Sequence, residues 1–127
     1  MDKTKGWLNL AEEDLLWAKA SFEDKILRGA CFAAQQAAEK ALKAFLISKA
    51  ITTPKIHDLV TLNNQCLNQN AQFQELEGAC NTLSPYYLST RYPDVTQFEE
   101  FSEKQTQDVI TQAEKVVNFV KSRLQNP

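Results

Sequence analysis

The chain has 127 residues, enough for one domain whose hydrophobic core needs neither disulfides nor metal. Its hydrophobic fraction of 43% is that of a globular protein, and its net charge of −2 argues against a general nucleic-acid coat or a polybasic membrane binder. The chain starts without the apolar segment of a secretion signal, and no apolar run reaches the roughly 18 residues of a membrane-spanning helix, so we expect a cytoplasmic protein.

The cysteines are three in number and widely spaced, with no C-x-x-C pair, at Cys31, Cys66 and Cys80. Each falls within a helical apolar pattern, where a free cysteine behaves as a small hydrophobic residue. A zinc site needs four ligands, and the only histidine is His57. We therefore expect buried structural thiols and no metal site.

A first helix is predicted by apolar residues that step by three and four, at Leu8, Ala11, Leu15, Ala18 and Phe22. Trp7, Leu10 and Trp17 widen this stripe beyond what one neighbouring helix covers, which indicates core packing together with a partner surface. A turn at Lys25 to Gly29 should precede a second helix at about Ala30 to Lys49. The seven alanines of the second helix let two helices approach closely, so these two helices should form the central hairpin.

The chain breaks at residues 52–54 and should resume as a third helix near His57, with Leu59, Leu62 and Cys66 inward. A polar turn at Asn68 to Asn70 follows. A fourth helix then carries one apolar face, made of Phe73, Leu76, Cys80 and Leu83. These segments continue the helical spacing of the first half of the chain.

Ser84 is predicted to be the N-cap of a further short helix with Pro85 at its first position, and Pro93 to end that helix. Ser102 and Gln105 fit a capping box for a last helix that ends near Leu124, with Thr96 and Glu99 as an alternative start. No segment alternates with period two. The sequence therefore predicts a single all-α domain over residues 1–127, a four- to five-helix antiparallel up-and-down bundle.

Three blocks of sequence resemble the HEPN family (higher eukaryotes and prokaryotes nucleotide-binding domain). They are the run AQQAAEKALKAFL at residues 34–46, His57-Asp58-Leu59, and Tyr86-Tyr87 followed by Arg91-Tyr92-Pro93-Asp94. The resemblance implies a helical bundle that commonly forms homodimers and that pairs with a small nucleotidyltransferase, often as a toxin–antitoxin module.

Many relatives are RNases whose site is an Arg followed, four to six residues later, by a His. Here no histidine follows Arg91, so the resemblance is to a HepT-like branch that lacks the RNase histidine. Cleavage of RNA without metal needs a general base, a general acid and a cation on the phosphorus. Arg91 can supply the cation, whereas His57 lies 34 positions earlier and only the fold can bring the two together.

Gln36, Lys40 and Lys43 share one face of the second helix. This strip is either a solvated face, with Glu39 paired to Lys43, or a surface that meets phosphate or a partner. Between residues 25 and 57 there are six lysines and arginines against Glu39 alone, so the local charge is basic in an acidic chain.

Two interpretations are also open for the segment around Arg91, and two for the pair His57-Asp58. Arg91 either pairs with Asp94 or a carbonyl while Tyr92 covers the core, or it binds a phosphate while Tyr92 stacks on a base. His57 either packs at a helix start capped by Asp58, or it contributes to the same site.

These observations favour a HEPN-type interaction and nucleotide-binding module over an enzyme. The candidate ligand-binding residues are Lys40, Lys43, Arg91, Tyr92, His57 and Gln36, with Arg91 as the catalytic residue if the protein is an RNase. We expect a homodimer, a nucleotidyltransferase subunit as partner, a bound nucleotide or RNA, and no other cofactor. The alternatives are an RNase toxin and a scaffold without a ligand.

Overall fold

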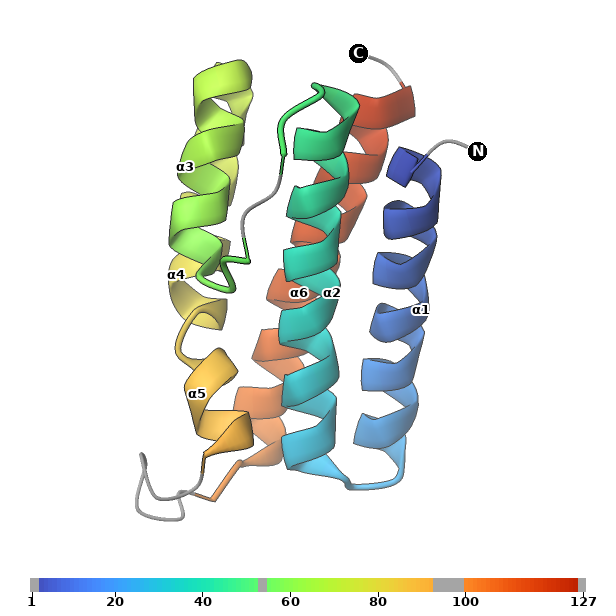
Figure 1. The fold of residues 1–127 in the computed structure, drawn as a ribbon. Helices are drawn as coiled ribbons and strands as arrows, with labels where there is room; N and C mark the ends of the chain where they lie inside the picture. The colour runs from blue at the N-terminus through green and yellow to red at the C-terminus, as the bar shows by residue number, and fades with distance from the viewer. Residues whose placement is uncertain (1–2, 53–54, 93–99, 126–127) are drawn as a thin grey trace.

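The computed structural model describes residues 3–52, 55–92 and 100–125, and within these ranges every regular element is a helix. The elements are α1 (Lys3–Glu23), α2 (Leu27–Ser48), α3 (Leu59–Gln69), the 3₁₀ helix η1 (Ala71–Leu76), α4 (Glu77–Leu83), α5 (Tyr86–Arg91) and α6 (Glu103–Gln125). The helices α2, α3 and α6 run in one direction, and α1 and the α4–α5 segment run in the other (Figure 1). The predicted all-α antiparallel bundle is confirmed.

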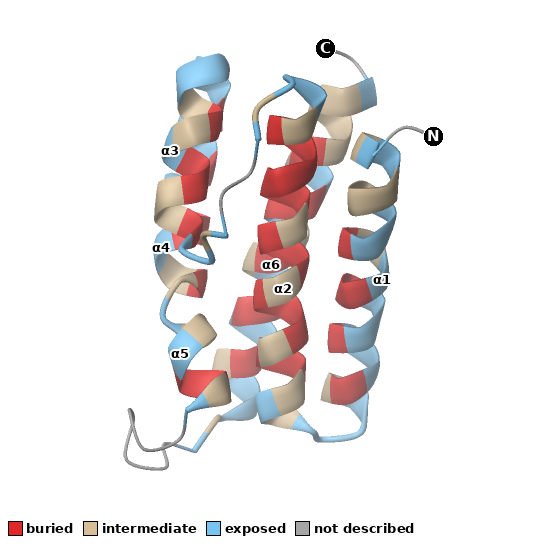
Figure 2. Cartoon of the chain, viewed as in Figure 1, coloured by how far each residue is buried: buried red, intermediate tan, exposed pale blue. Residues whose placement is uncertain are grey.

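Helix α2 is the centre of the bundle, since it contacts α1, α3, α5 and α6. Of its 22 residues 14 are buried, and burial follows it along most of its length (Figure 2). The seven alanines of α2 are fully buried, which lets α1 and α6 pack closely against it. Phe45 of α2 packs against Phe73 of η1, with 4.4 Å between ring centres and 48° between the ring planes, and so joins α2 to η1.

The turn between α1 and α2 is shorter than the sequence predicts. Lys25 has a φ of 63°, and this left-handed residue reverses the chain without a glycine. The Ile26 N–H donates to the Ser21 carbonyl at 2.8 Å, and α2 begins at once at Leu27. The prediction of a turn extending to Gly29 is therefore wrong, because Gly29 lies inside the first turn of α2.

Ser84 does not cap α5. An N-cap needs an extended backbone, whereas Ser84 is helical, with φ −54° and ψ −43°, and it ends α4 with its N–H bonded to the Cys80 carbonyl. Its hydroxyl donates instead to Asp58 Oδ1 at 2.9 Å. The capping box at the start of α6 is confirmed: the Gln105 N–H donates to Ser102 Oγ at 3.0 Å, and the Ser102 N–H to Gln105 Oε1 at 3.3 Å.

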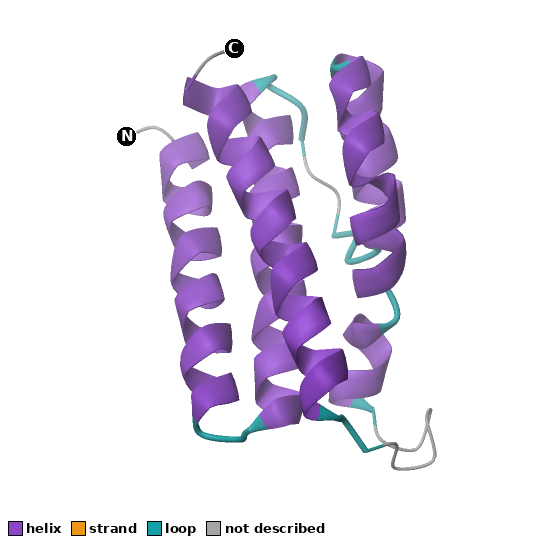
Figure 3. Ribbon diagram, turned by 180° about the vertical axis from the view of Figure 1, so that it is seen from behind, coloured by secondary structure: helices purple, strands orange, loops and turns teal. Residues whose placement is uncertain are grey.

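The loops of the described chain lie at the ends of the bundle and beside α3, as the view from behind shows (Figure 3). The expected chain stop at Pro93 and the alternative helix start at Thr96 and Glu99 lie outside the described residues. Among the described helices none is long and apolar enough to span a membrane.

All three cysteines are buried free thiols, as predicted. Burial raises the pKa of Cys80 to about 12, and it raises the pKa of Cys31 and Cys66 above the ordinary value as well. Burial and a raised pKa both disfavour the thiolate, which is the reactive form of cysteine.

Several large apolar side chains remain at the surface. Leu10 and Trp17 of α1 are about half exposed, and so are Leu88 of α5 and Tyr92 directly after it. Trp7, Phe22 and Phe32 are half-buried, and the ring of Phe32 meets Trp17 edge to face, with 6.0 Å between ring centres. The wide apolar face expected on α1 is thus open to solvent in the single chain.

Candidate functional site

Arg91 is held by two aromatic rings and a carbonyl. Its guanidinium carbon lies 4.0 Å from the ring centre of Tyr87 and 4.5 Å from that of Phe32 in α2. One guanidinium N–H donates to the Tyr87 carbonyl at 2.7 Å. Tyr87 and Arg91 are four residues apart on α5, so they share one face of this short helix. Cation–π contacts on two rings fix the direction of the guanidinium.

His57 packs on the same tyrosine. Its imidazole stacks on the ring of Tyr87, with 4.7 Å between ring centres and 18° between the ring planes. The fold therefore brings His57 and Arg91 to one aromatic ring although 34 positions separate them in sequence. A groove of about 380 Å³ opens beside them and is lined by His57, Asp58, Ser84, Tyr87 and Leu88.

Glu39 of α2 lies beneath His57 as a buried carboxylate. Its Oε2 atom is 3.0 Å from His57 Nδ1 and 3.0 Å from Lys43 Nζ, and its Oε1 atom accepts from Gln35 Nε2 at 3.3 Å. The side chains of Glu39 and Lys43 are only 5% and 8% exposed, whereas that of His57 is 45% exposed. This Glu39 network, made of Gln35, Glu39, Lys43 and His57, connects the interior of α2 to the groove.

The network also fixes the tautomer of His57. A carboxylate accepts hydrogen bonds and donates none, so Nδ1 of His57 carries the proton that faces Glu39. In the neutral imidazole Nε2 is then the acceptor. The amide of Gln35 is fully buried and also donates to the His57 carbonyl at 3.5 Å, while its own Oε1 atom has no partner within the described chain.

Asp58 caps α3 as expected. Its carboxylate accepts from the Val60 N–H at 3.1 Å, from the Thr61 hydroxyl at 2.8 Å and from the Ser84 hydroxyl at 2.9 Å. The hydrogen bond from Thr61, followed by those from Ser84 and the backbone, lowers the pKa of Asp58 below its ordinary value. The bond to Ser84 joins the start of α3 to the end of α4 and so shapes the groove.

The basic strip of α2 is less open than the sequence indicates. Lys43 is paired with Glu39, as predicted, but it is buried, so this position does not belong to a solvated face. A ring of α1 covers it: Lys43 Nζ lies 5.9 Å from the ring centre of Trp7. Lys40 is bonded to Asp14 of α1 at 2.6 Å, with 26% of its side chain exposed. Both lysines are thus held by carboxylates within the fold, and their binding of phosphate stays a prediction.

The other predicted residues lie at the surface or half-buried. Gln36 is half-buried on α2, and Tyr92 is 48% exposed, so the alternative in which Tyr92 covers the core is wrong. Of the two predicted partners of Arg91, a carbonyl is observed, that of Tyr87, while Asp94 lies outside the described residues. Among the described residues no cluster of His, Cys, Asp and Glu is suited to a metal ion.

Sequence reasoning left Glu39, Tyr87 and Phe32 out of the candidate site. For two of them the signal was present, because Glu39–Lys43 and Tyr87–Arg91 are both pairs at i, i+4 on a helix. Contact with His57 or Phe32 crosses between elements far apart in the chain. No sequence spacing reveals such contacts.

The model of the HEPN domain matches residues 4–123, nearly the whole chain. The chain belongs to the HEPN domain family. No curated protein sequence matches it closely enough to add a more specific relative.

Three solved structures share the HEPN fold of this chain. TT1696 from Thermus thermophilus is 28% identical with a TM-score of 0.85, and the match covers 96% of this chain and 98% of that one. ST0689, an archaeal HEPN homologue, is 29% identical with a TM-score of 0.78, covering 97% and 98%. The HEPN domain protein tm0613 from Thermotoga maritima is 23% identical with a TM-score of 0.76, covering 96% and 99%, and it supports the fold alone.

Proposed function

We propose that this HEPN domain protein is a nucleotide-binding interaction module of the HepT-like branch without the RNase histidine, and that the nucleotide binds at Arg91. One observation carries the proposal. The guanidinium of Arg91 is stacked on Tyr87 and Phe32, and Tyr87 also lines the groove beside His57. A guanidinium fixed in direction loses little freedom when it binds the planar edge of a phosphate.

The charges of Arg91 and Asp58 favour one orientation of a bound nucleotide. Arg91 can donate to phosphate oxygens and keep its bond to the Tyr87 carbonyl, because a guanidinium has five N–H donors. The carboxylate of Asp58, which lines the groove, repels an anion. The phosphates should therefore lie over Arg91, with the base stacked on the exposed ring of Tyr92.

Isothermal titration calorimetry with ATP, GTP and their diphosphates tests this site. Wild-type protein should bind, more weakly as salt is raised, and Arg91→Ala should bind roughly ten- to a hundredfold more weakly, because one charge-assisted contact is lost. Arg123→Ala is the matched control, since Arg123 also stacks on a ring, 4.4 Å from the centre of Phe119, but at the far end of α6. No heat at millimolar nucleotide would end the proposal, and equal weakening in both variants would place the site elsewhere.

Two macromolecular partners belong to this proposal. The exposed apolar side chains Leu10 and Trp17 of α1 with Leu88 of α5 support a homodimer. The resemblance to HepT-like proteins supports a nucleotidyltransferase subunit as the second partner. Co-expression with a small nucleotidyltransferase encoded by the neighbouring gene should give a complex that elutes together in gel filtration, and separate elution would contradict that part.

A second candidate function, metal-free RNA cleavage, is favoured by the shared contact of His57 and Arg91 with Tyr87. In this alternative Nε2 of His57 takes the proton of a ribose 2′-hydroxyl while Arg91 stabilises the charge on phosphorus. The 2′-oxygen would form a bond to phosphorus as the bond to the 5′-oxygen breaks, and a water would protonate that leaving oxygen.

We expect no cleavage of single-stranded or transfer RNA above a buffer control, because no histidine follows Arg91 and Asp58, whose pKa is lowered, is a poor proton donor for the leaving oxygen. Gel analysis of 5′-labelled RNA checks this expectation. Cleavage that His57→Ala and Arg91→Ala both abolish would replace the binding module by the RNase.

A further inference from the structure

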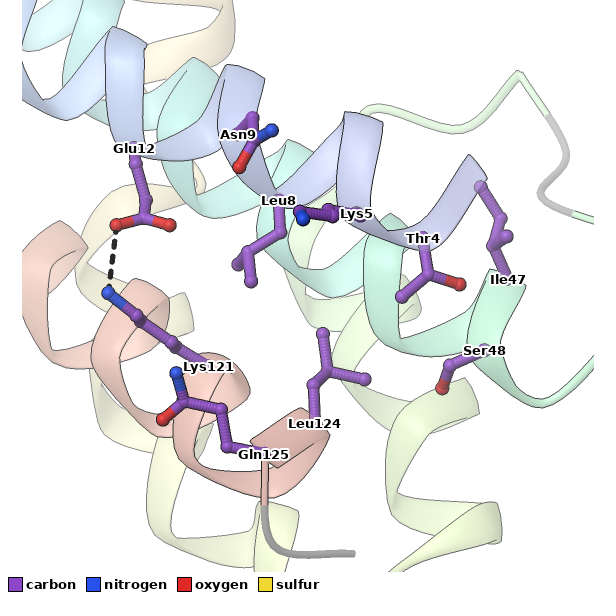
Figure 4. Close-up of a pocket in the computed structure, with 10 residues that line it drawn as sticks. All are labelled: Thr4, Lys5, Leu8, Asn9, Glu12, Ile47, Ser48, Lys121, Leu124 and Gln125. Atoms are coloured by element: carbon purple, nitrogen blue, oxygen red, sulfur yellow. Dashed lines mark hydrogen bonds and ion pairs between the residues drawn. The ribbon is translucent and has the colours of Figure 1, made fainter. Parts of the chain in front are cut away.

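A second cavity lies at the end of the bundle opposite α5, where the start of α1 meets the ends of α2 and α6 (Figures 1 and 4). Its volume is about 630 Å³, within the range of small-molecule sites. Helix α1 contributes Thr4, Lys5, Leu8, Asn9 and Glu12, helix α2 contributes Ile47 and Ser48, and helix α6 contributes Lys121, Leu124 and Gln125. None of these residues belongs to the nucleotide site proposed at Arg91.

The floor of the cavity is apolar and comes from three helices. Leu8, Ile47 and Leu124 are half-buried, and Leu8 and Leu124 point into the space from facing helices (Figure 4). Ile47 also lines a neighbouring cavity of about 340 Å³ that includes Trp7. When an apolar group covers partly exposed apolar side chains in a concave site, the burial of that surface stabilises the complex.

The rim of the cavity carries a net positive charge. Glu12 and Lys121 neutralise each other, with 3.1 Å between Oε2 and Nζ (Figure 4). Lys5 has neither an ion-pair nor a hydrogen-bond partner within the described part of the chain, so its ammonium is available to a ligand. A cation beside an apolar floor suits a molecule with one anionic end and one apolar end.

We propose that this cavity binds a small anionic amphiphile, a carboxylate with a short apolar body. The apolar body would cover Leu8, Ile47 and Leu124, and the carboxylate would accept from Lys5, with the amide of Asn9 beside it. The Glu12–Lys121 pair contributes no net charge, so selection between anion and cation rests on Lys5. This site is independent of nucleotide binding, and either can fail without the other.

The test uses three probes of one chain length: octanoate, 1-octanol and octylamine. In ¹H–¹⁵N NMR titrations of the whole protein, octanoate should shift the amide signals of Leu8, Asn9, Ile47 and Leu124. It should bind more tightly than the alcohol, and the amine should bind most weakly. Absence of shifts at these residues with millimolar octanoate, or equal affinity for all three probes, would overturn the proposal.

Single variants test which residues bind the carboxylate and which bind the apolar body of the ligand. Lys5→Ala should weaken octanoate roughly three- to tenfold and leave octanol unchanged, since the lost contact is an exposed charge–charge contact. Lys104→Ala, another exposed lysine but at the start of α6, should change neither. Leu8→Ser should weaken both probes, with the helical circular dichroism retained as proof of folding. Identical behaviour of Lys5→Ala and Lys104→Ala would refute the role of Lys5.

Discussion

Replacing Glu39 by methionine should destabilise the fold by about 3–5 kcal/mol, the usual cost of breaking a buried ion pair from one side. The side chain of Glu39 is 5% exposed and accepts from Lys43 Nζ at 3.0 Å, His57 Nδ1 at 3.0 Å and Gln35 Nε2 at 3.3 Å. Without it, the Lys43 ammonium stays buried at 8% exposure with no counter-charge. A loss of this size is a large part of the roughly 5–15 kcal/mol that stabilises a domain.

The single variants at Glu39 and Lys43 should differ in their effect on stability. Lys43→Met leaves a carboxylate that still accepts from His57 and Gln35, so it should cost only about 1–2 kcal/mol. The double variant removes both buried charges and replaces them with apolar groups of similar length, which is often nearly neutral. Adding Lys43→Met to Glu39→Met should therefore restore stability.

Urea unfolding followed by helical circular dichroism measures all three variants and yields the coupling free energy of the pair. Glu12→Met is the matched control, because Glu12 is also paired with a lysine, Lys121, but at 38% exposure, and it should cost under about 1 kcal/mol. If Glu39→Met stays within about 1 kcal/mol of wild type, or if the double variant is less stable than Glu39→Met, the network does not stabilise the fold in this way.

Two further predictions concern the helix cap and the assembly. Asp58 has a lowered pKa in the folded state, so its stabilising contribution is present above the unfolded pKa of about 3.9 and is lost as the pH falls through the folded value. Asp58→Ala should cost about 1 kcal/mol at pH 7 and remove that part of the pH dependence, as thermal melts between pH 2 and 7 would measure. Light scattering at micromolar concentration should give about 29 kDa, twice the chain mass of 14.4 kDa, and a monomer throughout that range would contradict the homodimer.

Most of the helices could be predicted because their signals are local, but the predicted fourth helix is divided in the structure into η1 and α4. Alanine spacing in α2, the Asp58 cap and the Ser102–Gln105 box all depend on residues within one or two turns of each other. The errors occurred where a local signal has two outcomes. A serine before a proline is a good N-cap only if its backbone is extended, whereas Ser84 is helical and ends α4, and its hydroxyl bonds to Asp58 in another element.

For the same reason, the sequence predicts only some of the residues in the candidate site. Arg91 and His57 stood out because their side chains are chemically distinctive, whereas Phe32 and Tyr87 look like core residues in any helix. Their role comes from meeting Arg91 across the boundary between α2 and α5. Lys43 is not a surface cation, because Trp7 of the neighbouring helix α1 covers it. The periodicity of α2 alone does not indicate which helix packs against it.

The burial of Lys43 also decides how binding variants should be interpreted. Because Lys43 and His57 share the Oε2 atom of Glu39, removing Lys43 leaves the buried Glu39 carboxylate beside His57 without its ammonium partner. Lys43→Ala would then weaken the binding of an anion in the groove through repulsion by Glu39, and adding Glu39→Gln would restore binding, whereas the loss of a lysine that contacts phosphate directly would not be rescued. Arg91→Ala weakens binding under either interpretation, so rescue of Lys43→Ala by Glu39→Gln separates a lysine that acts through Glu39 from one that touches the ligand.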